Sequence, residues 1–464
     1  MHAFGDDALA DHDAVGLAGE IRAGRVSRRE AVEAAIARTQ ELDPVLRGLA
    51  CERFADAVAE SDATHEGFFA GVPSFVKDNS DVAGLPTQQG TRSYVARPAK
   101  ADGDFARMLS LVGATVLGKT RLSEYGFSPS AEFRFDEPVR NPWHTAHTSG
   151  ASSAGSAAFV AAGAVPLAHA NDGGGSIRIP AACCGLVGIK PTRGRTPTDK
   201  GNREMPVRIV YDGVVTRSVR DTAAFLRESE RAYRDLELPP IGDVTGPGKK
   251  RLRVALVMDS MGGRVTDDET RATVRSTADL LEGLGHTVVE VPLPDMGSFA
   301  EDFLLYWSSL ALFLTRTGKL TFNRTYDRSR NDNFTLGLAA HAARNAWRLP
   351  TAIARLQRSH RITEQLYASH DVVLTPVLSL TTPEIGWLDP QQPYETVIGR
   401  ILEWIAFTPI QNATGDPAIS LPMGSTSTGL PIGVQLAAAR GYDRRLVEVA
   451  YELEQARPFA RIQG

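Results

Sequence analysis

The spacing of apolar residues predicts a pair of helices near the start of the chain. Over residues 13–42, DAVGLAGEIRAGRVSRREAVEAAIARTQEL, apolar positions recur with the period of a helix and are interrupted at AGRVS. Ser27 can cap the second helix, because Glu30 stands at the position that completes a capping box. We therefore expect a helical hairpin in this region.

Runs of apolar and β-branched residues predict strands that alternate with helices along the rest of the chain. One predicted helix centres on DFARMLSLVGA, and another covers residues 267–285 within a strand–helix–strand unit. Such alternation is typical of an α/β fold with a mixed, mostly parallel central sheet that helices cover on both faces. The strands are expected at residues 71–78, 115–120, 251–259, 286–294, 371–380, 417–422 and 430–437.

Composition excludes several classes of partner. The 464 residues include 51 basic and 55 acidic side chains, which gives a net charge of −4. The sequence therefore lacks the excess of basic residues that binds nucleic acid or an anionic membrane. Residues 143–171 contain no Asp, Glu, Lys or Arg, but they are too rich in Ala, Gly and Ser to predict a membrane span. The acidic N-terminus does not resemble an export signal, and three cysteines predict no disulfide framework. We expect a cytoplasmic monomer or homodimer that binds small molecules.

Three consecutive glycines, Gly173, Gly174 and Gly175, stand directly before Ser176. In an ordinary helix or strand they would cost conformational entropy, so their presence indicates a close approach to the backbone. Successive glycines let several N–H groups converge without obstruction by Cβ atoms, which is the arrangement that binds an oxyanion. A tight turn with a capping serine explains the same pattern equally well.

Other candidate residues carry little meaning when each is taken alone. Ser152 and Ser153 lie in a second glycine-bounded turn, which is more often a helix N-terminus than a catalytic site. Lys77 ends an apolar run, and a lysine at the end of a strand normally reaches solvent. Only the combination of these residues with Ser176 favours a catalytic role over a structural one.

Together these segments resemble the amidase signature family of serine hydrolases. The resemblance rests on GVPSFVKDN around Lys77, SGASSAGSAA around Ser152 and ANDGGGSIRIPAACCGLVGIKPTRGR around Ser176, and it continues through QNATGDPAISLP and GLPIGVQL. It is closest to the actinobacterial, mycobacterial-type amidases. The resemblance implies that residues 1–464 form one amidase domain of the α/β class.

The resemblance also implies a role for each site residue. Ser176 would be the nucleophile, Lys77 the base, and Ser152, preceded by a cis peptide bond, the relay between them. No metal and no cofactor would take part. The amides of an oxyanion hole would come from Gly173, Gly174, Gly175 and Ser176, and hydrogen bonds that brace the loop from Ser153, Asp172 and Arg178.

This chemistry sets a condition on Lys77. To accept a proton near neutral pH its pKa must fall from about 10.4 towards 7 or 8, which is roughly 3 to 5 kcal/mol of differential stabilisation. Burial without a paired carboxylate can produce this change. Asp78 is next in sequence, but neighbours in a strand point to opposite faces, so Asp78 need not keep Lys77 charged.

Some positions depart from the pattern of the amidase signature family. These departures concern the shape of the acyl pocket more than the three catalytic residues. They are Ala151 and Ala154 in place of common glycines, Ala170 and Asn171 where Gly-Thr is usual, and Gly173 in place of Thr or Ile.

Three other motifs suggest competing functions. GATVLGKT at residues 113–120 matches a nucleotide-binding P-loop, but ATVL favours a strand where a glycine-rich loop would be needed. His169 could replace Lys77 as the base in a Ser-His-Asp triad, although the chain has no GxSxG elbow. HTAH at residues 144–147 lacks a third ligand for zinc.

The resemblance leaves the substrate open. The family accepts amides, carbamates such as urethanes, and esters, and it includes a glutamine amidotransferase subunit for tRNA. That subunit usually carries Gln and Tyr-Gly-Arg where this chain has Ile179 and RGR at 193–195, so a stand-alone hydrolase is favoured. We expect a catalytic core at residues 65–225 and a variable substrate-pocket region at 297–400, whose aromatic residues and Trp404 predict a partly apolar pocket.

Overall fold

The computed structural model describes residues 1–63, 66–258, 260 and 263–463. It begins with the predicted helical hairpin, formed by α1 (Ala14–Arg22) and α2 (Arg28–Leu46). The capping box is present: the Glu30 amide donates to the Ser27 hydroxyl, and the Ser27 amide donates to the Glu30 carboxylate. This part of the sequence therefore encodes its helix start locally.

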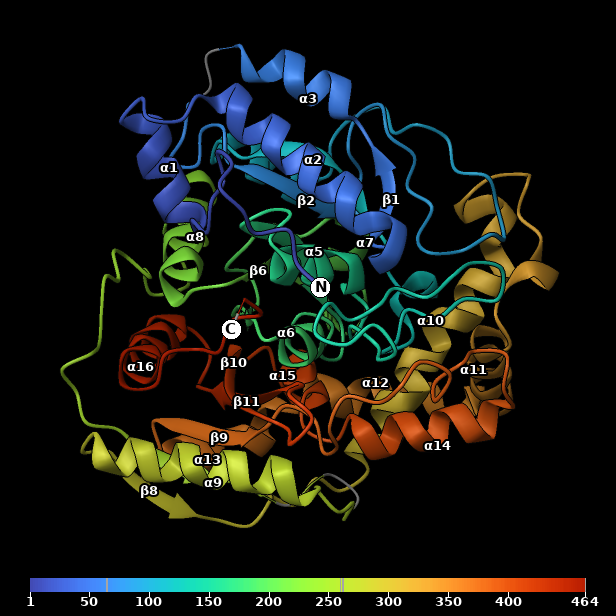
Figure 1. Ribbon diagram of the computed structural model, residues 1–464. Helices are drawn as coiled ribbons and strands as arrows, with labels where there is room; N and C mark the ends of the chain where they lie inside the picture. Colours follow the sequence, from blue (N-terminus) through green and yellow to red (C-terminus); the bar gives the residue numbers. More distant parts are fainter. Residues whose placement is uncertain (64–65, 259, 261–262, 464) are drawn as a thin grey trace.

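A small sheet of three strands lies beneath this hairpin (Figure 1). The strand β3 (Thr115–Thr120) lies between β1 (Leu49–Glu52), which is antiparallel to it, and β2 (Pro73–Lys77), which is parallel to it. Helices α3 (Phe54–Ser61) and α4 (Asp104–Leu111) connect these strands. Both predicted strands, at 71–78 and 115–120, are confirmed, and every residue of β2 is buried.

A larger mixed sheet of eight strands forms the centre of the described chain, in the order β4-β6-β5-β10-β11-β9-β7-β8. The α/β class and the mixed sheet are confirmed, but the prediction of mostly parallel strands is wrong. Within this larger sheet, five of the seven pairings among the described residues are antiparallel, and only β9-β7 and β7-β8 are parallel. A buried strand carries the same apolar pattern in either direction, so the pattern could not distinguish the two. The strands are β4 (Leu167–Asp172), β5 (Val187–Lys190), β6 (Tyr211–Thr216), β7 (Arg253–Leu256), β8 (Thr287–Glu290), β9 (Val372–Pro376), β10 (Ala418–Ser425) and β11 (Pro431–Ala437).

Several helices pack on this sheet. Helix α6 (Arg178–Cys184) approaches it closely, because a Cβ atom at Gly188 or Gly433 would lie within 2.6 Å of alanine side chains of α6. The predicted strand–helix–strand unit is confirmed as β7, α9 (Asp268–Gly283) and β8, with the last residue of the predicted strand 251–259 outside the described residues. The remaining helices against the sheet are α5 (Ala154–Ala162), α8 (Val219–Ala232) and α16 (Asp443–Ala456).

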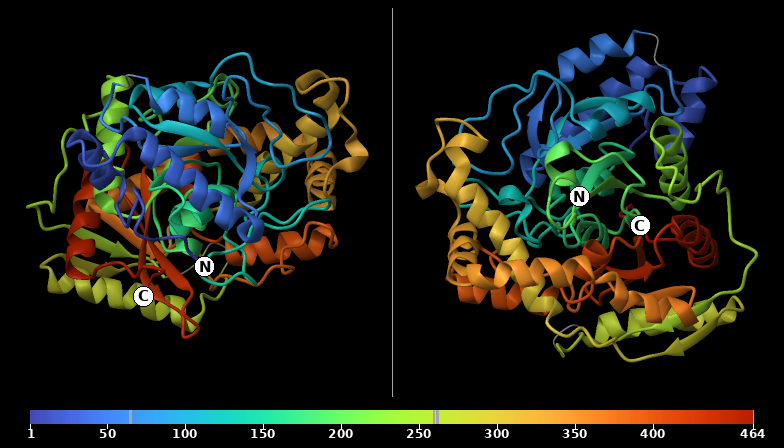
Figure 2. Two further views of the ribbon diagram at one scale, coloured as in Figure 1. Left: turned by 45° about the horizontal axis from the view of Figure 1, so that its top comes forward. Right: turned by 180° about the vertical axis from the view of Figure 1, so that it is seen from behind.

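A cluster of helices extends from one side of the molecule (Figures 1 and 2). Its longest member, α10 (Phe299–Thr321), packs on α11 (Asn333–Arg344) and α12 (Leu349–Gln357), and α11 also contacts α14 (Tyr394–Trp404). These helices occupy most of the predicted pocket region at 297–400. Within the described residues, no helix is both long enough and apolar enough to cross a membrane. The short helices α7 (Lys200–Arg203), α13 (His360–Ser369) and α15 (Pro409–Thr414) complete the fold.

Candidate active site

Lys77 is the last residue of β2, and its side chain is fully buried. Its Nζ lies 2.7 Å from the Ser152 hydroxyl oxygen, 2.6 Å from Oδ1 of Asn171 and 3.3 Å from the Asn171 carbonyl oxygen. Burial lowers the pKa of Lys77 to about 7, although the negative charges of Asp212 and Asp172 oppose this change. The amine is therefore available as a base near neutral pH.

Asp78 does not pair with its neighbour Lys77. Its carboxylate lies 2.7 Å from Nζ of Lys119 on the adjacent strand β3, and both side chains are buried. Lys119 also donates to the carbonyl of Pro86 and the hydroxyl of Thr87. Lys119 thus lies within a strand and is engaged in an ion pair, which rules out the P-loop interpretation of residues 113–120.

Ser152 and Ser153 lie in the turn that leads into α5. The Ala151–Ser152 peptide bond is cis. The Ser153 hydroxyl lies 2.6 Å from the carbonyl oxygen of Ser176 and 3.2 Å from that of Asn171, and the Ser153 amide also donates to the Ser176 carbonyl. These hydrogen bonds hold the turn with Ser152 against the loop with Ser176.

The loop that carries Ser176 connects the end of β4 to the start of α6. Asp172 and Arg178 flank it and form a fully buried pair, with two guanidinium-to-carboxylate distances of 2.9 Å. The Asp172 carboxylate also accepts from the amides of Gly175 and Ile177, and Arg178 holds its pKa well below the usual range despite burial. Asp172 and Arg178 thus bind each other, and Asp172 also binds two amides of this loop.

The three glycines of the loop differ in their surroundings. The Gly175 amide donates to Asp172 at 2.6 Å, which conflicts with its predicted role as an oxyanion donor because that N–H is already engaged. Gly175 also has a φ of +136°, and a Cβ there would lie 2.4 Å from the Thr408 hydroxyl. The amides of Gly173, Gly174 and Ser176 have no acceptor in the described part of the chain. Three of the four predicted amides thus remain available.

Sequence reasoning missed a second group of residues that brace this loop. The Thr408 hydroxyl donates to the Gly174 carbonyl, and the side-chain amide of Asn412 donates to the carbonyl and the carboxylate of Asp172. Arg178 reaches three amide oxygens, which belong to Gln411, Asn412 and Gln435. The segment QNATGDPAISLP had carried part of the resemblance, and its polar residues were the available signal.

The rival histidines have other partners. Nδ1 of His169 accepts from the Lys77 amide, Nε2 lies 3.1 Å from Asp212, and the ring stacks on Phe105. His169 is thus part of the support for β2, and these contacts engage both of its ring nitrogens. His144 and His147 lie against each other near the surface, and no group of three possible metal ligands occurs among the described residues.

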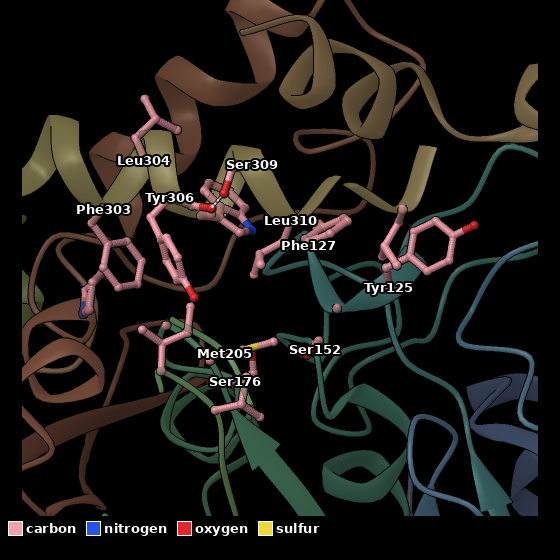
Figure 3. Close-up of a pocket in the computed structure, with 18 of the residues that line it drawn as sticks. Tyr125, Phe127, Ser152, Ser176, Met205, Phe303, Leu304, Tyr306, Ser309 and Leu310 are labelled. Carbon is pink, nitrogen blue, oxygen red and sulfur yellow. Dashed lines mark hydrogen bonds between the residues drawn. The ribbon is translucent and has the colours of Figure 1, made fainter. Parts of the chain in front are cut away.

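A cavity of about 1080 Å³ opens over these residues and is lined mainly by apolar side chains. Figure 3 shows Ser152 and Ser176 on one side of it, and Phe303, Tyr306 and Leu310 of α10 across from them. Phe127 lies beside Leu310 in this view, and Tyr125 lies to the right of Phe127. The pocket region was predicted to be partly apolar, and α10 supplies much of that surface. Trp404 is fully buried beside Leu380 and does not line the cavity.

The fold is of the α/β class with a mixed central sheet, and the sequence comparison gives the family: the chain belongs to the amidase family, which hydrolyses amide bonds. The profile of the family described as Amidase matches residues 30–447. A Mycobacterium leprae relative named as an amidase, AmiC, is 55% identical over 464 residues, which cover 100% of this chain and 99% of the relative.

Two further relatives extend this comparison. The 6-aminohexanoate-cyclic-dimer hydrolase of Pseudomonas sp. strain NK87 is 34% identical over 474 residues, covering 96% of this chain and 95% of that protein. The solved structure of a 6-aminohexanoate cyclic dimer hydrolase is 30% identical, covers 99% of both chains and superposes with a TM-score of 0.89. A bacterial aryl acylamidase structure, 23% identical over 97% of this chain and 96% of that one, shares the fold with a TM-score of 0.85.

Proposed function

We propose that this amidase cleaves its substrate through a covalent acyl-enzyme, with Ser176 as nucleophile, Ser152 as proton relay and Lys77 as base. The observation that carries the proposal is the contact of 2.7 Å between Nζ of Lys77 and the Ser152 hydroxyl, made by a buried lysine that has no carboxylate partner in the part of the chain that the structure describes. An amine with a pKa of about 7 is matched to general-base catalysis at neutral pH.

The proposed reaction has two halves. Ser176 attacks the substrate carbonyl while its proton passes to the oxygen of Ser152, and the proton of Ser152 passes to Lys77. The amides of Gly173, Gly174 and Ser176 bind the oxyanion of the tetrahedral intermediate. Lys77 then returns its proton through Ser152 to the leaving nitrogen, which departs as the amine. Water attacks the acyl-enzyme by the same relay in the second half and releases the carboxylate.

Two variants separate the lysine base from a histidine base. Lys77→Met removes the proposed base and is expected to lower kcat/KM by about 10²- to 10⁴-fold. His169→Asn is the matched control, because an amide oxygen can accept from the Lys77 amide as Nδ1 does. We expect this control to keep most of the activity. A larger loss of kcat/KM in His169→Asn than in Lys77→Met would assign the base to His169 instead.

The apolar cavity supports a substrate with an extended aliphatic or aromatic acyl group. The relative that hydrolyses the cyclic dimer of 6-aminohexanoate supports an aliphatic amide. Carbamates and esters are the second candidate, since the relay would serve any of these carbonyls. A panel of anilides, aliphatic amides, aryl carbamates and esters, each tested with Ser176→Ala as background, would rank these classes by kcat/KM. If carbamates gave the highest kcat/KM, the proposed activity would be that of a urethanase and not that of an amidase acting on carboxylic amides.

A tRNA-linked role is less well supported. Ile179 packs beside Gly175, and Arg193 donates to the Tyr211 hydroxyl and to the carbonyl of Ala413, so both residues have structural contacts within the fold. We propose residues 65–225 as the catalytic core and residues 297–400 as the variable region that shapes the pocket. Glutaminase activity that depends on a partner protein would contradict this assignment.

A further inference from the structure

Asn171 contacts the amine of Lys77, which also contacts the hydroxyl of the relay serine. It is the fifth residue of β4, it is buried, and it also borders the cavity. Its Oδ1 lies 2.6 Å and its carbonyl oxygen 3.3 Å from Nζ of Lys77. The Ser152 hydroxyl is the third neighbour, at 2.7 Å. Among the residues that the structure describes, Asn171 therefore supplies two of the three hydrogen-bond partners of this amine.

The proton count of these partners is informative. A neutral lysine amine has two N–H donors and one lone pair, and both oxygens of Asn171 can only accept. When Asn171 takes both N–H groups, the lone pair is left for the Ser152 hydroxyl, whose proton it must receive. We propose that Asn171 is a positioning residue that directs the lone pair of Lys77 at Ser152. This inference rests on the proposed function and adds a residue to it.

The residue type matters for this role. A threonine hydroxyl can donate as well as accept, so it would not fix the direction of the lone pair. An aspartate would place a negatively charged carboxylate beside the amine and would keep the amine protonated. Asparagine accepts the same hydrogen bond without carrying a charge.

Other titratable side chains face Lys77, so a pH test must account for them. Asp172 of β4 and Asp212 of β6 raise its pKa by their charges. His169 accepts from its backbone amide, and Asp78 is paired with Lys119. None of these groups changes in a variant at position 171, so a shift specific to that variant reports the contact with Asn171.

The test uses the pH dependence of labelling of Ser176 by an alkyl fluorophosphonate, which needs no knowledge of the substrate. In Asn171→Asp we expect the alkaline rise of the labelling rate to move up by roughly 1 to 3 pH units. In Asn171→Leu, of similar size, we expect the rate to fall by about 100-fold at every pH. Asn202→Asp is the matched control, because Asn202 lines the same cavity and has no contact with Lys77 among the described residues.

The outcomes are distinct. A profile of Asn171→Asp that coincides with wild type, or an equal shift in Asn202→Asp, would overturn the role of Asn171. If Asn171→Asp does not fold, an unchanged rate in folded Asn171→Leu would overturn it as well. In each of these cases, labelling of Ser176 in the wild type would still support Ser176 as the nucleophile, so only the role of Asn171 would be rejected. Absence of label on wild-type Ser176 would overturn both proposals.

Discussion

The carboxylate of Asp78 and the amine of Lys119 form a buried ion pair at 2.7 Å, one residue away from Lys77 in the chain. Lys119 binds this carboxylate, and among the described residues no acidic side chain is in direct contact with the Lys77 amine, so desolvation dominates the pKa of Lys77. The two lysines lie in adjacent strands, and of the two only Lys119 contacts a carboxylate within the described residues. The ion pair is not part of the candidate active site, but it engages the carboxylate that neighbours Lys77 in the chain.

Removal of Lys119 is expected to destabilise the protein. Lys119→Met leaves the Asp78 carboxylate buried without its cation, and breaking such a pair typically costs about 3 to 5 kcal/mol of unfolding free energy. Chemical denaturation measures this loss. As a control, Lys250→Met removes the lysine of a surface pair with Asp371 and should change stability little. Equal effects of the two variants would contradict the importance of the buried pair.

The rate of hydrolysis should follow the protonation of Lys77. The pKa of Lys77 is lowered to about 7, and only the neutral amine can accept the proton of Ser152. We expect kcat/KM to be low at pH 5, to rise through pH 7 and to level off above pH 8. Steady-state kinetics with a chromogenic amide measure this profile. Activity that falls as pH rises through 7 would show that the protonated form is required, which the account excludes.

Stability should also report the buried lysine. The pKa of Lys77 is about 7 in the folded protein against 10.5 as its ordinary value, so between these two pH values the unfolded state binds more protons. Unfolding free energy therefore rises with pH in that window, by at most about 1.4 kcal/mol per pH unit for this group. Lys77→Met lacks this contribution. The difference between wild type and Lys77→Met should grow from pH 7.5 to pH 9.5, and a constant difference would contradict a lowered pKa.

The brace of the Ser176 loop offers another test. Asp172→Asn removes the charge that pairs with Arg178 and one acceptor for the amides of Gly175 and Ile177. We expect a loss of about 3 to 5 kcal/mol in unfolding free energy, together with a fall in kcat, because the loop loses its fixed shape. Glu290→Gln is the control, since its pair with Arg275 is half exposed. Wild-type kcat in Asp172→Asn would contradict the bracing role.

Local features of the fold could be predicted from the sequence, but strand direction could not. The capping box of Ser27 and Glu30 and the strand Thr115–Thr120 depend on neighbouring residues, and both are confirmed. The direction of a strand depends on its connection to a distant partner, so the sheet was wrongly expected to be mostly parallel. Strand β4 (Leu167–Asp172) was not predicted, because its sequence LAHAND has no β-branched residue.

The candidate site shows the same limit. Lys77, Ser152 and Ser176 were found because each stands in a distinctive local segment, and their predicted roles remain to be tested. Thr408 and Asn412 reach the Ser176 loop from more than 230 residues further along the chain, so only the fold brings them there. The engagement of the Gly175 amide by Asp172 likewise depends on backbone geometry that glycine-rich sequence leaves open.

The most direct test of the central claim is to trap the acyl-enzyme. Wild type is incubated with a slowly hydrolysed aryl carbamate, and the digested protein is analysed by mass spectrometry, with Ser176→Ala treated in parallel. We predict a carbamoyl adduct on Ser176 in the wild type, none in Ser176→Ala, and turnover of amide lost in that variant. An adduct on another residue, or amide turnover by Ser176→Ala equal to wild type, would contradict the account.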